Sequence, residues 1–157
     1  MTLKCVDFLG NTHIVDEADV IDRLSVYCVY IVNETVLMMQ DSYSHRWELP
    51  GGGTEGNETE QEGLIREFLE ETGLHMLDVP TLIDEWTEYY FDLPTNQAWH
   101  SKRKFYTTTT TDGELLTKGN NDDSMAAQFI ALDQIKHRVV APRIREVIDL
   151  AVKLARK

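Results

Sequence analysis

The sequence predicts an α/β domain in which helices pack on a sheet, and three observations support this class. Short runs rich in β-branched and aromatic residues recur along the chain as far as residue 132. Residues 58–72 and 142–157 instead repeat apolar residues at helical spacing. The length of 157 residues, 42% of them hydrophobic, suits one compact domain with a full core. We therefore expect a single domain over residues 1–157.

The expected strands are separated by turn residues and are followed by one closing helix. A short hairpin around Gly10 and Asn11 begins the domain, and the strands are expected at 3–15 (the hairpin), 23–32, 34–41, 81–91, 104–111 and 128–132. A polar loop is expected at 117–124. Pro142 suits the first turn of the closing helix, which we interpret as scaffold.

The charge balance limits the possible partners. Twenty-seven acidic against fifteen basic residues give a formal net charge of −12, which repels a polyanionic backbone and argues against nucleic-acid binding. A substrate that carries phosphates would need a cation as mediator. The longest apolar run, residues 26–32, is too short to cross a bilayer, and Asp7 interrupts any signal-like segment. We expect a cytoplasmic protein that binds no membrane.

Cysteine and histidine residues give little sign of chemistry. Cys5 and Cys28 lie in apolar, strand-like segments, which favours core packing over a disulfide or a redox role. The five histidines form no pair at the spacing of metal ligands. A zinc hydrolase is therefore not expected.

The helix at 58–72 collects acidic residues near its C-terminal end. At about 100° per residue, Glu67, Glu70 and Glu71 fall on the face opposite the apolar residues. A carboxylate in the last turn faces unpaired carbonyls and costs roughly 0.3–1 kcal/mol. Arg66 is placed one turn before Glu70 and can hold it, which leaves Glu67 and Glu71 without an evident partner.

Two interpretations of this acidic face remain open. It can be an ordinary solvated face, or it can bind a divalent cation, since clustered carboxylates are hard ligands suited to Mg²⁺ or Mn²⁺. Gly63 on the same face is a poor helix residue unless another group approaches closely. Asn57 or Thr59 can cap the helix, and Gly73 fits a left-handed cap at its end.

These residues follow a known pattern. From Gly52 the chain has five residues, Glu58, seven residues, Arg66-Glu67-Phe68, one residue, Glu70-Glu71, one residue and Gly73-Leu74. This arrangement resembles the Nudix box, and residues 47–53, "WELPGGG", resemble the segment that usually precedes it. Phe68 departs from the aliphatic residue that the family prefers, and Gly63 replaces a commoner alanine. Neither position is a ligand.

The resemblance implies a fold, a reaction and a set of site residues. The fold would be an α/β/α sandwich with a mixed β-sheet between helices. The reaction would be Mg²⁺-dependent hydrolysis of a pyrophosphate bond in a nucleoside diphosphate linked to another group, such as a nucleoside triphosphate. Carried over by position, the metal ligands would be Glu67, Glu70, Glu71 and the Gly52 carbonyl. The catalytic residues would be Glu70, Glu67 and Arg66.

The resemblance also bears on the general base and on the substrate contacts. In this family the base can come from a later loop, where this chain offers Asp122 and Asp123. Arg46 and Lys104, with the adjacent Lys102 and Arg103, are scarce cations that can meet phosphates or can be ordinary solvated bases. Tyr90 lies where relatives acting on diadenosine polyphosphates often have a tyrosine, although "EYYF" is also typical of an ordinary strand. Many relatives form homodimers.

Two alternatives belong to different classes. A nucleotide-sensing module without catalysis could keep the fold, but the intact set of Arg66 and three glutamates favours an enzyme. Isomerisation of an isoprenoid diphosphate occurs in the superfamily and would call for a catalytic cysteine. Neither Cys5 nor Cys28 lies in a site-like context.

Overall fold

The computed structural model describes residues 1–116 and 126–157. The expected polar loop and the candidate bases Asp122 and Asp123 lie outside these residues. The elements in order are β1 (Thr2–Val6), β2 (Thr12–Asp16), the 3-10 helix η1 (Glu17–Asp19), β3 (Val20–Val32), β4 (Thr35–Gln40), β5 (Trp47–Glu48), β6 (Gly51–Gly53), α1 (Glu60–Thr72), β7 (Leu74–Met76), β8 (Thr81–Asp92), β9 (Gln97–Thr108), β10 (Thr111–Gly113), β11 (Gln128–Ala131), the 3-10 helix η2 (Leu132–His137) and α2 (Ile144–Ala155).

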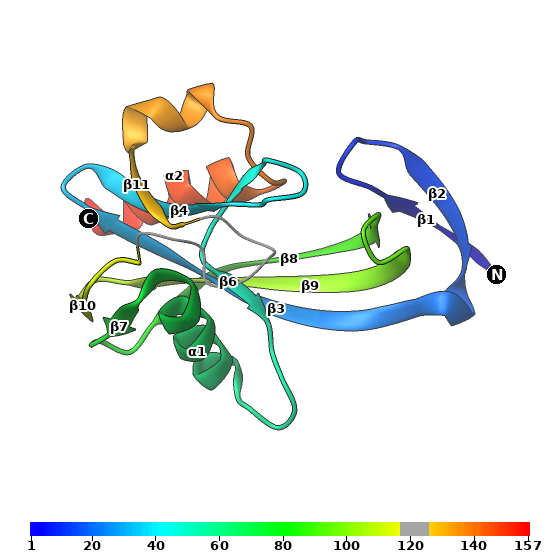
Figure 1. Ribbon diagram of the computed structural model, residues 1–157, viewed down its shortest axis with the longest axis horizontal. Helices are drawn as coiled ribbons and strands as arrows, with labels where there is room; N and C mark the ends of the chain where they lie inside the picture. The colour runs from blue at the N-terminus through cyan, green and yellow to red at the C-terminus, as the bar shows by residue number, and fades with distance from the viewer. Residues whose placement is uncertain (117–125) are drawn as a thin grey trace.

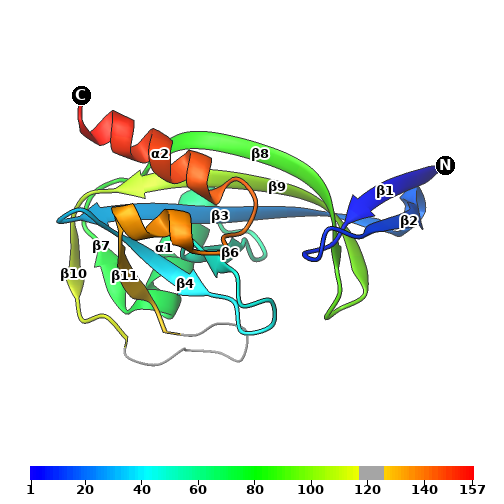
Figure 2. The same ribbon diagram turned by 90° about the horizontal axis from the view of Figure 1, so that it is seen from above.

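The centre of the molecule is a mixed sheet with the strand order β11-β4-β3-β9-β8-β1-β2. β3 runs parallel to β9, whereas β8 and β4 run antiparallel to their neighbours β9 and β3. Figures 1 and 2 show this curved sheet with α1 and α2 on opposite faces. The expected α/β/α sandwich with a mixed sheet is confirmed.

β3 explains why both faces of the sheet are covered. Its residues alternate between two hydrophobic clusters, with Val29 packed toward α2 and Val26 and Cys28 packed toward α1. Successive strand residues point to opposite faces, so a continuous apolar run requires burial on both sides. Phe68 of α1 is fully buried in its cluster and meets Tyr30 edge to face, with ring centroids 6.2 Å apart. The aromatic departure from the family pattern is therefore accommodated by packing.

The N-terminal hairpin forms as expected and extends from one end of the sheet (Figure 1). Its turn is held by Asp7, whose carboxylate accepts hydrogen bonds from the Leu9 and Asn11 amides and lies 2.7 Å from His13 Nε2. β1 meets β8 through the pairing of Val6 with Tyr90. This attachment places the hairpin turn next to the end of β8.

Helix α1 begins at a capping box and ends at a glycine. Thr59 is the N-cap, and its hydroxyl accepts a hydrogen bond from the Glu62 amide while the Glu62 carboxylate accepts one from the Thr59 amide. Thr59 rather than Asn57 therefore caps the helix. Gly73 has φ of 80°, the left-handed conformation expected at the other end.

Several expected boundaries were wrong. β3 and β9 begin earlier than expected, at Val20 and Gln97. The strand expected at 104–111 breaks after Thr108, because the Asp78 carboxylate binds the backbone amides of Thr109 and Thr110 and removes them from the ladder. Helix α2 begins at Ile144 rather than in the turn that contains Pro142. None of the helices in residues 1–116 and 126–157 is long and apolar enough to cross a membrane.

Candidate active site

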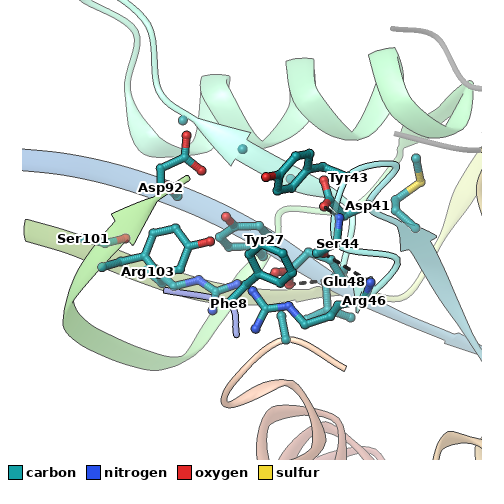
Figure 3. Close-up of a pocket in the computed structure, with 18 of the residues that line it drawn as sticks. Phe8, Tyr27, Asp41, Tyr43, Ser44, Arg46, Glu48, Asp92, Ser101 and Arg103 are labelled. Atoms are coloured by element: carbon teal, nitrogen blue, oxygen red, sulfur yellow. Dashed lines mark hydrogen bonds and ion pairs between the residues drawn. The ribbon is translucent and has the colours of Figure 1, made fainter. Parts of the chain in front are cut away.

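A hollow of about 770 Å³ lies beside the acidic face of α1. Its walls come from β3, β6, β8, β9, the loop between β4 and β5, and the turn of the N-terminal hairpin. Figure 3 shows Phe8, Arg46, Glu48 and Arg103 converging on this hollow. Its volume lies in the range of ordinary small-molecule sites.

Glu67 and Glu71 of α1 line the hollow beside the glycine strand β6. Glu71 accepts a hydrogen bond of 3.3 Å from the Gly51 amide. A Cβ atom at Gly52 would lie 2.9 Å from the carboxylate carbon of Glu67, closer than real Cβ contacts. Gly52 therefore allows the backbone of β6 to lie against the helix carboxylates.

Arg66 organises the acidic face from within α1. Its guanidinium donates to Glu58 at 2.7 Å, to Glu67 at 3.1 Å and to Glu70 at 3.2 Å, and it also reaches the Gly53 carbonyl. The expected pairing with Glu70 is present. The expectation that Glu67 lacks a partner was wrong, because the planar guanidinium has five donors and can serve several carboxylates at once.

The glycine inside α1 has a steric reason. A Cβ atom at Gly63 would lie 2.9 Å from Glu58 Oε1 and 3.2 Å from Thr54 Cγ2. Glu58 must approach this closely because its carboxylate binds Arg66 and the Glu55 amide. Gly63 thus makes room for the residue that fixes Arg66.

The carboxylates of the hollow stand in an unfavourable electrostatic setting. Burial, and after it the charge of Glu67, raises the pKa of Glu71 to about 8. Burial also raises the pKa of Glu67, although Arg66 acts in the opposite direction. Two close oxygen donors that repel each other in a partly buried site fit a hard divalent cation, which would relieve the repulsion.

The third glutamate is placed differently. Glu70 does not line the hollow, and half of its side chain is exposed, at 51%, on the outer side of Arg66. Within residues 1–116 and 126–157, no three histidine, cysteine or acidic side chains form a preassembled metal site. The structure thus brings Glu67, Glu71 and Gly52 together and leaves Glu70 at the edge.

The residues predicted to bind substrate divide into two groups. Arg46 and Tyr90 both line the hollow, so Tyr90 is at once a residue of strand β8 and a wall residue. Lys104 does not line it. Its ammonium donates to both carboxylate oxygens of Glu60, at 2.7 and 2.9 Å, and lies 3.4 Å from Glu85. Alternation along β9 turns Lys104 toward α1 and its neighbour Arg103 into the hollow.

Sequence reasoning missed several wall residues. Arg103 is only 5% exposed, donates to Glu48 at 2.6 Å and stacks over Tyr27 at 4.7 Å. The strand alternation of β9 was a signal that could have separated Arg103 from Lys104. No local signal pointed to Phe8, which reaches the hollow only because the hairpin turn folds against β8.

Arg23 and Arg46 are cations without ion pairs in the described part of the chain. Arg23 lies beside Gly53 and stacks 5.5 Å from the centre of the Trp99 ring. Arg46 stacks 5.7 Å from the centre of the Phe8 ring, and its Nε atom is buried without a hydrogen-bond partner. Both guanidinium groups are available to an anionic ligand.

Comparison with known proteins supports the resemblance found in the sequence. The model of the NUDIX domain matches residues 22–151. An RNA pyrophosphohydrolase of Sphingopyxis alaskensis is 39% identical over 54 residues, which cover 34% of this chain and 34% of that protein. The chain thus matches only about a third of the length of such curated relatives.

Solved structures extend the likeness to most of the fold. A MutT protein from Bacillus halodurans superposes with a TM-score of 0.67 at 22% identity, over 81% of this chain and 80% of that one. A NUDIX hydrolase from Nitrosomonas europaea gives 0.69 at 16% identity, over 84% and 89%. Because the family model spans most of the sequence, and Gly52, Glu67 and Glu71 of the box line the hollow, the chain belongs to the Nudix family of hydrolases.

Proposed function

We propose that this protein hydrolyses a pyrophosphate bond in a nucleoside triphosphate or a related nucleotide, with Mg²⁺ as its cofactor. The observation that carries the proposal is the pair of Glu67 and Glu71 at the wall of a hollow of about 770 Å³, oriented by Arg66 and the β6 glycines. Family membership supports the reaction class.

Glu67, Glu71 and the Gly52 carbonyl would hold the cation, and Glu70 would serve as a further ligand or as the residue that orients water. A divalent cation bound there neutralises charge on the phosphates and lowers the pKa of bound water. Mn²⁺ can substitute, since it prefers the same oxygen donors.

The chain's own residues supply positioning and charge. Arg66 fixes Glu67 and Glu70 in one network, so that their oxygens face a defined direction. Arg46 and Arg23 line the same hollow and would bind the phosphate oxygens that the carboxylates repel. Glu71 must lose its proton to act as a ligand, and the charge of a bound cation would favour that loss.

The hairpin turn bears on the extent of the domain. Phe8 lines the hollow although it precedes the region matched by the family model. We propose that residues 1–157 form one domain, because the active site would lose part of its wall without the hairpin.

The names of the curated relatives raise a second substrate. The 5′-triphosphate end of an RNA carries the same anhydride as a free nucleotide, and several relatives are named RNA pyrophosphohydrolases. A net charge of −12 disfavours a long polyanion, so we place free nucleotides first. The expectation that the protein binds no nucleic acid stays a prediction.

The test is phosphate and pyrophosphate release with Mg²⁺ from nucleoside triphosphates, dinucleoside polyphosphates, nucleotide sugars, ADP-ribose and a 5′-triphosphate RNA. Glu71→Gln should abolish most turnover, whereas Glu146→Gln, on the exposed face of α2, should not. Tight nucleotide binding without turnover would support the sensing module instead. Full turnover by Glu71→Gln would contradict the metal assignment.

A further inference from the structure

Glu88 of β8 is a wall residue of the hollow to which the proposed reaction assigns no role. Its carboxylate takes part in no hydrogen bond or ion pair with the described residues. Burial raises the pKa of Glu88, and the charge of Glu48 adds to this rise, whereas the charges of Arg103 and Arg46 oppose it. A partly buried carboxylate normally has donors, so this acceptor is available to a ligand.

Two aromatic side chains, Phe8 and Tyr43, line the same hollow. Phe8 and Tyr43 meet edge to face with ring centroids 5.4 Å apart, and Arg46 stacks on Phe8. Tyr43 is 54% exposed as a residue. Figure 3 shows its side chain beside the hollow. Aromatic rings offer the surface on which a heteroaromatic ring packs.

The strand pairings place Glu88 between Arg103 and the hairpin turn. Glu88 pairs with Ser101, and it lies two residues along β8 from the pair of Trp86 with Arg103 and two residues from Tyr90, which pairs with Val6. Arg103 binds Glu48, and the β6 glycines that follow Glu48 in the chain lie against Glu67 and Glu71. One end suits phosphates and a cation, and the other suits the base of the same nucleotide.

We infer that Glu88 is the specificity-determining residue of a nucleobase subsite that selects a ring with two adjacent N–H donors, as in guanine. This inference rests on the proposed function, because it names the base of the proposed nucleotide substrate. The ring would pack against Tyr43 and Phe8, and its donor edge would meet the Glu88 carboxylate.

The donor pattern of each base explains the choice. An ionised carboxylate only accepts hydrogen bonds, and it does so with two oxygens side by side. Guanine presents N1–H and the 2-amino group in that arrangement. Adenine and cytosine place a ring acceptor beside their amino group, and uracil flanks its single N–H with two carbonyls. Those bases would leave one carboxylate oxygen facing an acceptor.

The experiment compares kcat/KM for GTP, ITP, ATP and UTP with Mg²⁺, for the native chain, Glu88→Gln and Glu85→Gln. Glu85 is on the same strand and outside the hollow, so it is the matched control. A bidentate contact discriminates between bases by roughly 10- to 100-fold. We expect GTP to exceed ATP by this factor, with ITP between them.

Glu88→Gln should remove this preference or shift it toward ATP, because a glutamine amide can donate to one ring atom and accept from the next. Glu85→Gln should keep it. Equal use of the four nucleotides by the native chain, or an unchanged preference in Glu88→Gln, would overturn the inference. Triphosphate RNAs that begin with G or A, assayed in parallel, show whether the guanine belongs to a free nucleotide or to an RNA end.

Binding separates this inference from the proposed reaction. If no nucleotide is hydrolysed, calorimetric titration with GDP and ADP still measures the base preference. GDP binding at least tenfold tighter than ADP, and lost in Glu88→Gln, would support the subsite although the hydrolase proposal had failed. Equal or undetectable binding of both would overturn the subsite.

Discussion

The substitution Glu71→Gln removes an ionisable proton from the hollow and keeps an acceptor for the Gly51 amide. A carboxyl group whose pKa is higher in the folded than in the unfolded chain holds a proton that unfolding releases. The stability that protonated Glu71 contributes is fully present below pH 4.5, the ordinary pKa of a glutamate, and is lost as the pH rises to about 8. Glutamine has no such proton, so the variant should lack this pH dependence.

The magnitude follows from the pKa. A rise from 4.5 to about 8 corresponds, at 1.36 kcal/mol per pH unit, to at most about 5 kcal/mol of lost stability. Solvent in the open hollow reduces this figure, and we expect Glu71→Gln to be about 2–4 kcal/mol more stable than the native chain at pH 8 without metal. At pH 4.5 the two proteins should have nearly equal free energies of unfolding.

The assay is urea unfolding in a chelator at several pH values between 4.5 and 8, with Glu146→Gln as the exposed control. The stability difference between Glu71→Gln and the native chain should grow with pH, and the control should show no trend. Added Mg²⁺ should stabilise the native chain and not the variant. A difference that is constant with pH, or a variant less stable at pH 8, would refute the electrostatic reasoning.

Three further substitutions test neighbouring parts of the structure. Gly52→Ala should lower kcat at least tenfold with little change in thermal stability, because its methyl group would displace the Glu67 carboxylate; unchanged kcat would contradict this. Lys104→Met should lower the free energy of unfolding by about 1 kcal/mol, because its contact with Glu60 is lost, and should leave KM unchanged. A raised KM would show that Lys104 contacts the substrate. Burial raises the pKa of Asp78, but hydrogen bonds from threonine hydroxyls and backbone amides outweigh burial and lower the pKa to about 2. The stability that ionised Asp78 contributes is therefore present above pH 4 and is lost as the pH falls toward 2. Asp78→Asn should weaken the pH dependence of acid unfolding over that window.

Much of the fold could be predicted because its determinants are local. The capping residue, the helical spacing of apolar residues and the terminal glycine specify α1 within a few residues of chain, and the alternation of β3 specifies a strand buried on both faces. The break in the strand after Thr108 was missed because its cause, Asp78, acts from about thirty residues away in the sequence and competes for backbone amides.

The candidate site was only partly predictable for a related reason. Glu67 and Glu71 share one helix, so their spacing alone places them together. The pairing of Arg103 with Glu48 joins strands that are far apart in the sequence, and a cation on β9 shows its partner only when the sheet is assembled. Lys104 and Arg103 are adjacent and chemically alike, yet strand alternation gives one to α1 and the other to the hollow.

The acidic end of α1 persists because the rest of the helix supplies more stability than the carboxylates remove. The unfavourable dipole contacts and the like-charge pair amount to roughly 0.2–1 kcal/mol each, and burial of ionised Glu71 accounts for most of the about 2–4 kcal/mol expected at pH 8. Truncation of a fully buried phenylalanine such as Phe68 costs about 3–5 kcal/mol, and the Thr59 capping box adds about 1 kcal/mol. The helix can therefore hold Glu67 and Glu71 in an unfavourable position before any ligand arrives. A bound cation removes the repulsion between Glu67 and Glu71. The free energy that this repulsion costs the metal-free protein is therefore recovered as binding free energy of the cation.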